Sequence, residues 1–95
     1  MSAFVILDIH VTDPVRYEEY KKLATPTVEQ YGGRYLARGG KVETLEGDWS
    51  PSRLVILQFD STDQAKAWLD SPEYGQAKGF RHQASTSKVV VVEGV

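Results

Sequence analysis

The chain contains no cysteine, which excludes a disulfide framework, a thiolate nucleophile and a cysteine-ligated zinc site. It also lacks an excess of basic residues: 11 Lys and Arg stand against 13 Asp and Glu, for a net charge of −2. Nucleic-acid binding needs a clear cationic surplus, so we expect no nucleic-acid partner. No apolar run approaches the length of a membrane span, and the first one ends at Asp8 without a basic segment before it. We therefore expect a cytoplasmic protein with no membrane partner.

The composition that remains is that of an ordinary folded domain. Of the 95 residues, 41% are hydrophobic and 25% are charged, a composition typical of a folded domain rather than of a disordered chain. The length suits one domain over residues 1–95, because domains typically run to about 100–150 residues.

The first half of the chain predicts strand, helix and strand. Residues 3–11 are apolar and β-branched, as in a strand, and a helix follows from Pro14 to about Tyr31, capped by Thr12 and Asp13 and stopped by Gly32-Gly33. Pro26 should kink or divide this helix near residues 23–25. Residues 34–38 form the next strand, which we expect to continue over 41–45 after a bulge at Gly39-Gly40.

The second half predicts strand, helices and strand. Residues 54–59 are continuously apolar, which is typical of a central strand. Ser61 and Gln64 fit a capping box, in which each side chain bonds the backbone of the other at a helix start. Ser71-Pro72 begins a further helix to Ala84, and residues 88–92 form the last strand. The order is βαββαβ.

A short internal repeat supports this order. Val5-Ile6-Leu7 and Thr12-Asp13 recur as Val55-Ile56-Leu57 and Thr62-Asp63 at a constant offset of 50 residues. The repeat falls where strand meets helix in both halves. We therefore predict an α+β, ferredoxin-like antiparallel sheet with its helices on one face.

The other face of this predicted sheet is too apolar for a monomer. One side of the strands carries Phe4 and Ile6, Leu54 and Ile56, and Val90 and Val92, where a solvated face should be polar. We expect a homodimer packed sheet to sheet, because two-fold dimers are the commonest oligomers. The alternative is a monomer whose loop 41–51 folds back over the sheet.

Four segments resemble the bacterial family known as domain of unknown function 1330. They are Tyr-Gly-Gly-Arg-Tyr-Leu-Ala-Arg-Gly-Gly at 31–40, Leu-Glu-Gly-Asp-Trp at 45–49, Pro-x-Arg-Leu-Val at 51–55 and Ser-Pro-Glu-Tyr at 71–74. The resemblance implies the dimeric α+β barrel, in which two ferredoxin-like sheets face one another. It implies no substrate, because relatives at superfamily level range from cofactor-independent monooxygenases to ligand-sensing domains.

Two constellations are candidates for catalysis. Asp8 and His10 lie two apart on a strand and so share a face; with Gln58 and Asp60 they would gather at one end of the central strands, where His10 could act as a general base. The alternative is a solvated strand end. The second constellation is Trp68, Tyr74 and Arg81. The resemblance to the monooxygenases implies that Tyr74 and Arg81 hold a developing negative charge beside Trp68, whereas helical spacing of aromatics more often indicates core.

A third constellation is basic and aromatic. Arg34, Arg38 and Arg53 lie near Trp49, and their guanidinium groups suit the carboxylate of an acidic metabolite. Alternatively they pair with Glu43, Glu46 or Asp48 across the hairpin or the subunit boundary.

The sequence predicts neither a cofactor nor a metal. His10 and His82 have no metal-ligand spacing, and no HExxH, P-loop or dinucleotide-binding fingerprint occurs. The function we predict is binding of a small organic molecule by a homodimer. Two forms of this function stay open. The first is a cofactor-independent isomerase or monooxygenase-like enzyme, in which the catalytic residues are His10, Tyr74 and Arg81 and the substrate-binding residues are Asp8, Arg38, Trp49, Arg53 and Trp68. The second is a non-catalytic ligand-sensing or dimerisation module.

Overall fold

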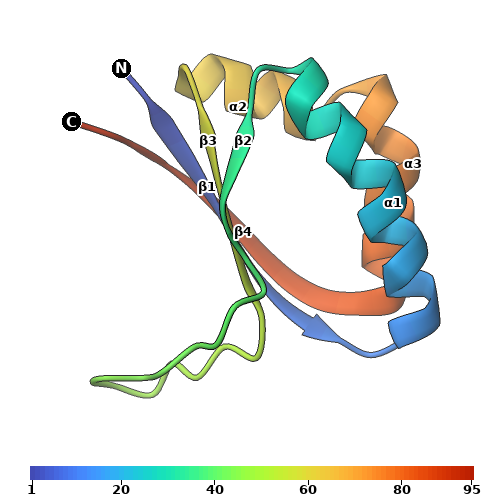
Figure 1. Ribbon diagram of the computed structural model, residues 1–95, viewed down its shortest axis with the longest axis vertical. Coiled ribbons are helices and arrows are strands. Elements are labelled where there is room, and N and C mark those ends of the chain that lie inside the picture. The colour runs from blue at the N-terminus through green and yellow to red at the C-terminus, as the bar shows by residue number, and fades with distance from the viewer.

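The computed structural model describes residues 1–95 as one antiparallel sheet with helices on one side (Figure 1). The strand order is β2-β3-β1-β4, so β1 and β3 are the central strands, as predicted. The ferredoxin-like α+β prediction is confirmed. The strands are β1 (Ala3–Val11), β2 (Arg34–Arg38), β3 (Leu54–Phe59) and β4 (Ser85–Glu93), and the helices are α1 (Pro14–Gln30), α2 (Thr62–Leu69) and α3 (Pro72–Ala84).

Alternation along the central strands separates two faces of the sheet. In β1, Val5, Leu7 and Ile9 are buried against the helices, while the residues between them are only partly covered. The same pattern holds in β3, where Val55, Leu57 and Phe59 are buried. These six side chains form the sheet's half of the core, since side chains two apart on a strand point the same way.

Helix α1 begins and ends as its sequence predicts. The Asp13 side chain accepts a hydrogen bond from the Arg16 N–H at 3.2 Å, and Pro14 occupies the first turn. At the other end Gly32 has a φ of +76°, and the Gly33 N–H donates to the Val28 carbonyl at 2.8 Å.

Of the two outcomes expected for Pro26, a kink or a division of the helix, the division is wrong, because α1 runs unbroken through Pro26. Pro26 lies on the exposed side of the helix. Buried residues on both sides of it, Ala24 and Val28, hold the two halves against the core. Tertiary packing here outweighs the local cost of the proline.

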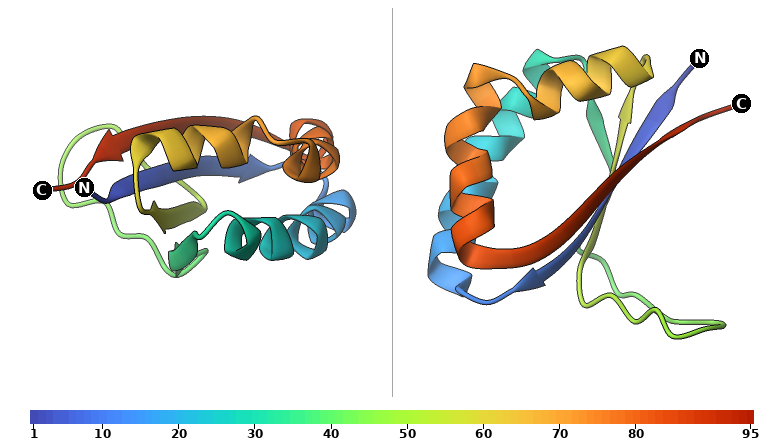
Figure 2. Two further views of the ribbon diagram at one scale, coloured as in Figure 1. Left: turned by 90° about the horizontal axis from the view of Figure 1, so that it is seen from above. Right: turned by 180° about the vertical axis from the view of Figure 1, so that it is seen from behind.

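The expected long second strand is also wrong. β2 ends at Arg38, and residues 41–45 form no strand. The irregularity lies earlier than Gly39-Gly40: Tyr35 pairs with Leu57 but Ala37 pairs with Ile56, so Leu36 is an extra, bulged residue. Residues 39–53, from here on the arm, connect β2 to β3, and the middle of this segment projects from the sheet on the side away from the helices (Figures 1 and 2).

Serine residues cap both remaining helices. The Ser61 hydroxyl accepts from the Gln64 N–H at 3.0 Å, and the Ser71 hydroxyl accepts from the Tyr74 N–H at 3.1 Å. The reciprocal half of the predicted capping box is not formed. Instead the Gln64 side chain donates to the Tyr31 carbonyl at 2.7 Å, which ties the start of α2 to the end of α1.

The face of the sheet opposite the helices carries no secondary structure (Figure 2). We call this the open face. Val90 and Val92 are 58% and 50% exposed there, which confirms the apolar second face that the strand pattern predicts. The arm does not fold over it; only Trp49 reaches it, at Asp8. None of the helices is long and apolar enough to span a membrane. The open face comprises Phe4, Ile6, Asp8, His10, Arg34, Leu54, Ile56, Gln58, Lys88, Val90 and Val92.

Candidate functional site

The bulge in β2 decides where its two arginines point. Arg34 and Arg38 are four apart, so regular alternation would place both on one face. The extra residue Leu36 reverses the alternation between them. Arg34 consequently lies opposite Gln58 on the open face and donates two hydrogen bonds to its side-chain oxygen, at 3.0 and 2.7 Å. Arg38 lies opposite buried Val55 and points toward α1.

Arg38 is held in place by uncharged groups. Its Nη2 donates to the Thr25 hydroxyl of α1 at 2.7 Å, and its guanidinium carbon lies 4.4 Å from the centre of the Tyr35 ring. The contact with the ring is a cation–π interaction, which orients the guanidinium without neutralising it. Its remaining N–H donors are left for another acceptor.

Arg53 is held in the same manner from the other side. It directly precedes β3, its Nε–H donates to the Tyr17 hydroxyl at 2.9 Å, and its guanidinium lies 5.2 Å from the centre of that ring. The guanidinium also packs on Gly39, which has a φ of +72° and where a side chain would overlap it. Glycine at position 39 therefore serves both the turn after β2 and the close approach of Arg53.

The two guanidinium groups line one recess between α1 and the β2–β3 edge of the sheet. We call it the arginine recess; its volume is about 370 Å³. A narrower hollow of about 20 Å³ leads inward from it toward Tyr17, Tyr20 and Tyr35. The arginine recess is lined by Glu18, Lys21, Lys22, Thr25, Arg38 and Arg53.

The charge of the arginine recess is strongly positive. Its one carboxylate, Glu18, is bonded by Lys21 at 2.9 Å, and this bond lowers the Glu18 pKa below its ordinary value of 4.5. Neither Arg38 nor Arg53 has a carboxylate within 4.0 Å, so the expectation that they pair with Glu43, Glu46 or Asp48 fails within the subunit. Burial raises the pKa of Tyr17, which Arg53 partly opposes, so its hydroxyl stays protonated at neutral pH.

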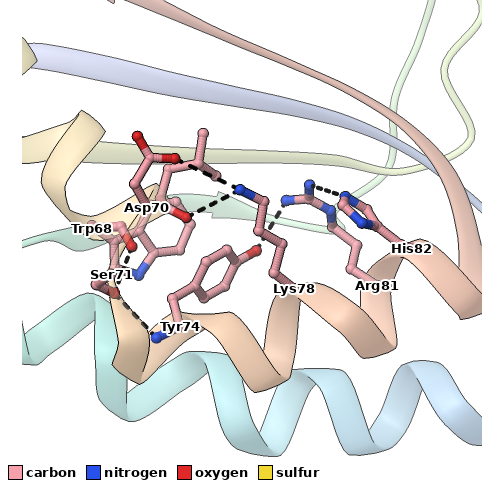
Figure 3. A network of polar contacts seen from close by, with 8 residues as sticks. Trp68, Asp70, Ser71, Tyr74, Lys78, Arg81 and His82 are labelled. Carbon is pink, nitrogen blue, oxygen red and sulfur yellow. Dashed lines mark hydrogen bonds and ion pairs between the residues drawn. The ribbon is translucent and has the colours of Figure 1, made fainter.

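Trp68, Tyr74 and Arg81 do lie together, inside the core (Figure 3). The rings of Trp68 and Tyr74 are 4.2 Å apart between centres, and Arg81 Nη1 donates to the Tyr74 hydroxyl at 3.0 Å. All three are at most 4% exposed, and none lines a main cavity. The Tyr74 hydroxyl also bonds that of Tyr20 at 2.8 Å. Burial raises the pKa of both tyrosines, so both are neutral.

The guanidinium of Arg81 is unusual because it is buried without a carboxylate. Its Nε has no hydrogen-bond partner, and its Nη2 lies 3.2 Å from His82 Nε2 (Figure 3). Burial and then the charge of Arg81 lower the pKa of His82 below its ordinary 6.5. At neutral pH the imidazole is therefore uncharged, and no second positive charge adds to that of Arg81.

Asp8 and Trp49 meet on the open face. Trp49 Nε1 donates to Asp8 Oδ2 at 2.7 Å, and both line a hollow of about 260 Å³. His10 is exposed on the same strand and forms no hydrogen bond through its side chain. The expected gathering of Asp8 and His10 with Gln58 and Asp60 is wrong. β1 and β3 are antiparallel, so Asp8 pairs with Leu54 while Gln58 pairs with Phe4 at the opposite end.

The structure thus divides the predicted site residues into three groups and leaves His10 apart. The groups are Arg38 with Arg53, Asp8 with Trp49, and Trp68 with Tyr74 and Arg81. Sequence reasoning missed the contribution of Tyr17, Thr25 and Tyr35, which orient the arginines of the first group. Tyr17 lies on the predicted core stripe of α1, and nothing in its spacing indicates that its hydroxyl reaches Arg53. No group of three or more His, Asp or Glu side chains forms a metal-binding cluster.

These features define a ferredoxin-like α+β protein with a basic recess on the helix side of its sheet and an uncovered apolar face on the other. The chain belongs to the family described as "Domain of unknown function (DUF1330)", which matches residues 2–95. No curated protein matches it significantly.

Solved structures share the fold. A protein of unknown function from Rhodopseudomonas palustris is similar with a TM-score of 0.79 at 18% identity, over 99% of this chain and 82% of that one. A dimeric ferredoxin-like protein of unknown function from Thermobifida fusca gives 0.68 at 18%, over 97% and 90%. SnoaB, a cofactor-independent oxygenase from Streptomyces nogalater, gives 0.63 at 14%, over 99% and 92%. At these identities the likeness establishes the fold.

Proposed function

We propose that this protein is a cytoplasmic homodimer that binds a small organic anion in the arginine recess. The observation that carries the proposal is that Arg38 and Arg53 line one recess with no carboxylate within 4.0 Å of either. Guanidinium groups bind carboxylates through two parallel hydrogen bonds, and so favour planar, charged ligands.

The way the arginines are held supports binding. Thr25 and Tyr17 each take one donor of a guanidinium, and the rings of Tyr35 and Tyr17 restrain its plane. Because these long side chains are already ordered, binding of an anion loses little of their conformational entropy, which is the usual gain from preorganisation. The volume of about 370 Å³ falls in the range of small-molecule sites, and the tyrosines of the inner hollow offer an apolar continuation.

The homodimer is supported by the open face. Pairing through the open face would remove its apolar surface from water, and this gain is the main contribution that offsets an association cost of about 4–15 kcal/mol. The similar proteins from Thermobifida fusca and Jannaschia are described as dimeric ferredoxin-like proteins. Pairing through the open face leaves the arginine recess of each copy accessible, because the recess lies on the helix side.

The separation of the candidate catalytic residues favours the non-catalytic form of this function. An enzyme that uses His10 as base and Tyr74 and Arg81 as donors needs all three at one substrate. His10 is exposed at the end of β1, whereas Tyr74 and Arg81 are closed in the core. The oxygenase likeness supports catalysis only through the shared fold.

The test is a titration of small carboxylates, aliphatic and aromatic, followed by thermal shift and calorimetry. We expect stabilisation of the wild-type protein, with the affinity at least tenfold weaker in Arg38→Gln and in Arg53→Gln. Arg34→Gln is the matched control, because this arginine lies on the same strand but on the open face. Absence of any stabilising carboxylate, or equal binding by all three variants, would contradict the proposal. If His10→Ala lost carboxylate binding while the three arginine variants kept it, the binding site would lie on the open face instead.

A further inference from the structure

The arm is long for its place in the fold. Its 15 residues connect two neighbouring antiparallel strands, a connection that usually takes two to five. It contains no helix or strand, and residues 43–50 are all exposed. Segments of this length without regular structure are uncommon in compact domains and usually have a function of their own.

The arm nevertheless has a defined shape. The Thr44 hydroxyl donates to the Trp49 carbonyl at 2.7 Å and so joins its outgoing and returning limbs. Trp49 Nε1 is bonded to Asp8, which fixes the returning limb to the open face. The limb beyond these ties still projects from the body of the subunit, on the side away from the helices (Figures 1 and 2).

The projecting part exposes apolar surface that the subunit does not use. Leu45 is 89% exposed and Trp49 is 57% exposed, and neither belongs to the core cluster. Trp49 lies at the open face, which is itself apolar and uncovered, and Leu45 follows four residues earlier in the same arm. Adjoining exposed apolar surfaces of this kind mark a protein–protein interface.

The charges of the arm and the open face are complementary. Glu46 and Asp48, at the projecting end, have no cationic partner within 4.0 Å. On the open face, Arg34 and Lys88 have no acidic partner within that distance, although Lys88 is in register with Asp8. Opposite charges left unpaired on two parts of one chain can be paired by a second copy of it.

We propose that the arm is an interface element, which reaches across to a second copy of this chain and packs Leu45 and Trp49 against it. The inference rests on the proposed homodimer: two copies that pair through their open faces each bring an arm, which projects on that side, onto the other copy. The second copy then also closes the hollow of about 260 Å³ between Trp49 and Lys88.

Sedimentation equilibrium of the full chain gives the first test. Leu45→Ser should raise the dimer dissociation constant at least tenfold, since Leu45 lies outside the subunit's own core cluster and so should not change its stability. Val15→Ser is the matched control: Val15 is 79% exposed on α1, and the same change there should leave the constant unaltered. Added salt should weaken the wild-type dimer, because surface charge pairs are screened.

Cross-linking gives the second test. The chain has no cysteine, so Leu45→Cys introduces a single thiol that can carry a photoreactive label. In a mixture of isotopically light and heavy chains, we expect the label to form light–heavy cross-links to the second copy.

The outcomes separate this inference from the function on which it rests. A wild-type protein that stays monomeric at several hundred micromolar overturns the homodimer and the arm together. A stable dimer with an unchanged dissociation constant in Leu45→Ser, and with cross-links only inside one chain, overturns the arm alone and leaves the homodimer in place. Anion binding in the arginine recess is unaffected by either result.

Discussion

The hydroxyl oxygens of Tyr20 and Tyr74 lie 2.8 Å apart, so one buried hydrogen bond joins α1 to α3 between the two helices. Tyr74 has a second role that Tyr20 lacks, because its oxygen also accepts a hydrogen bond from Arg81 Nη1. Removal of the Tyr74 hydroxyl therefore takes away an acceptor of Arg81, whereas removal of the Tyr20 hydroxyl does not.

Tyr74→Phe should destabilise the protein more than Tyr20→Phe. Loss of the Tyr20 hydroxyl removes one hydrogen bond and should lower the free energy of unfolding by about 1 kcal/mol. Loss of the Tyr74 hydroxyl leaves Nη1 of the buried Arg81 guanidinium without its acceptor and should cost about 2–3 kcal/mol. Urea denaturation at one fixed protein concentration measures both. Equal losses of unfolding free energy in the two variants would show that the hydrogen bond from Arg81 to Tyr74 contributes nothing to stability.

The alternation set by the bulge can be tested by changing chain length in β2. Deletion of Leu36 removes the extra residue and leaves Arg38 facing α1, so folding and Arg38-dependent anion binding should persist. Insertion of one alanine between Ala37 and Arg38 should instead turn Arg38 to the open face and break its bond to Thr25. We expect the insertion to weaken anion binding about as much as Arg38→Gln. Equal anion binding by the deletion variant and the insertion variant would contradict the inference that the bulge turns Arg38 toward α1.

The pair formed by Tyr31 and Glu73 should make stability depend on pH. The Tyr31 hydroxyl donates to Glu73 Oε1 at 2.7 Å, and this bond is the main cause that lowers the Glu73 pKa below 4.5. A carboxyl with a lower pKa in the folded state stabilises the protein above its unfolded pKa, and this stabilisation is lost as the pH falls through the folded pKa. Tyr31→Phe should therefore destabilise the protein at pH 7 and have little effect near pH 2–3.

Denaturation curves over this pH range provide the measurement. Glu73→Gln serves as the control, because it removes the titrating group and should reduce the pH dependence as Tyr31→Phe does. A Tyr31→Phe effect that is the same at pH 7 and at low pH would argue that the bond does not involve the carboxylate.

Thr27 should matter for stability although it is small and polar. Its hydroxyl accepts the indole N–H of Trp68 at 3.0 Å, and both side chains are buried. Thr27→Val keeps the shape but leaves that N–H without a partner, at a cost of about 1–3 kcal/mol in the free energy of unfolding. The same replacement at exposed Thr12 should stay within about 0.5 kcal/mol. A neutral Thr27→Val would mean that the indole finds another acceptor.

Most of the fold could be predicted from the sequence, because its signals were local. The bounds of β1, β3 and α3, the caps at Asp13, Ser61 and Ser71, and the stop at Gly32-Gly33 each follow from side chains next to one another in the chain. The errors arose where a distant contact decided the outcome. Gln64 bonds Tyr31 rather than its own cap, and Pro26 is tolerated because the core holds both sides of it.

The candidate site could be predicted less well. The residue types were sufficient to select Arg38 and Arg53, but alternation alone would have placed Arg34 beside them. The bulge at Leu36 has no signature in the sequence, since no glycine or proline stands at residues 35–37 to mark it. The directions of side chains on an edge strand therefore had to come from the structure.

Ala37 and Arg38 are consecutive residues whose side chains leave β2 on opposite faces of the sheet. An anion held by one face and a partner held by the other would therefore never compete for the same surface. Each copy in a pair would keep its own complete recess, built from one chain alone. The stoichiometry should be one anion per polypeptide, with two equivalent, non-cooperative sites in each pair of chains.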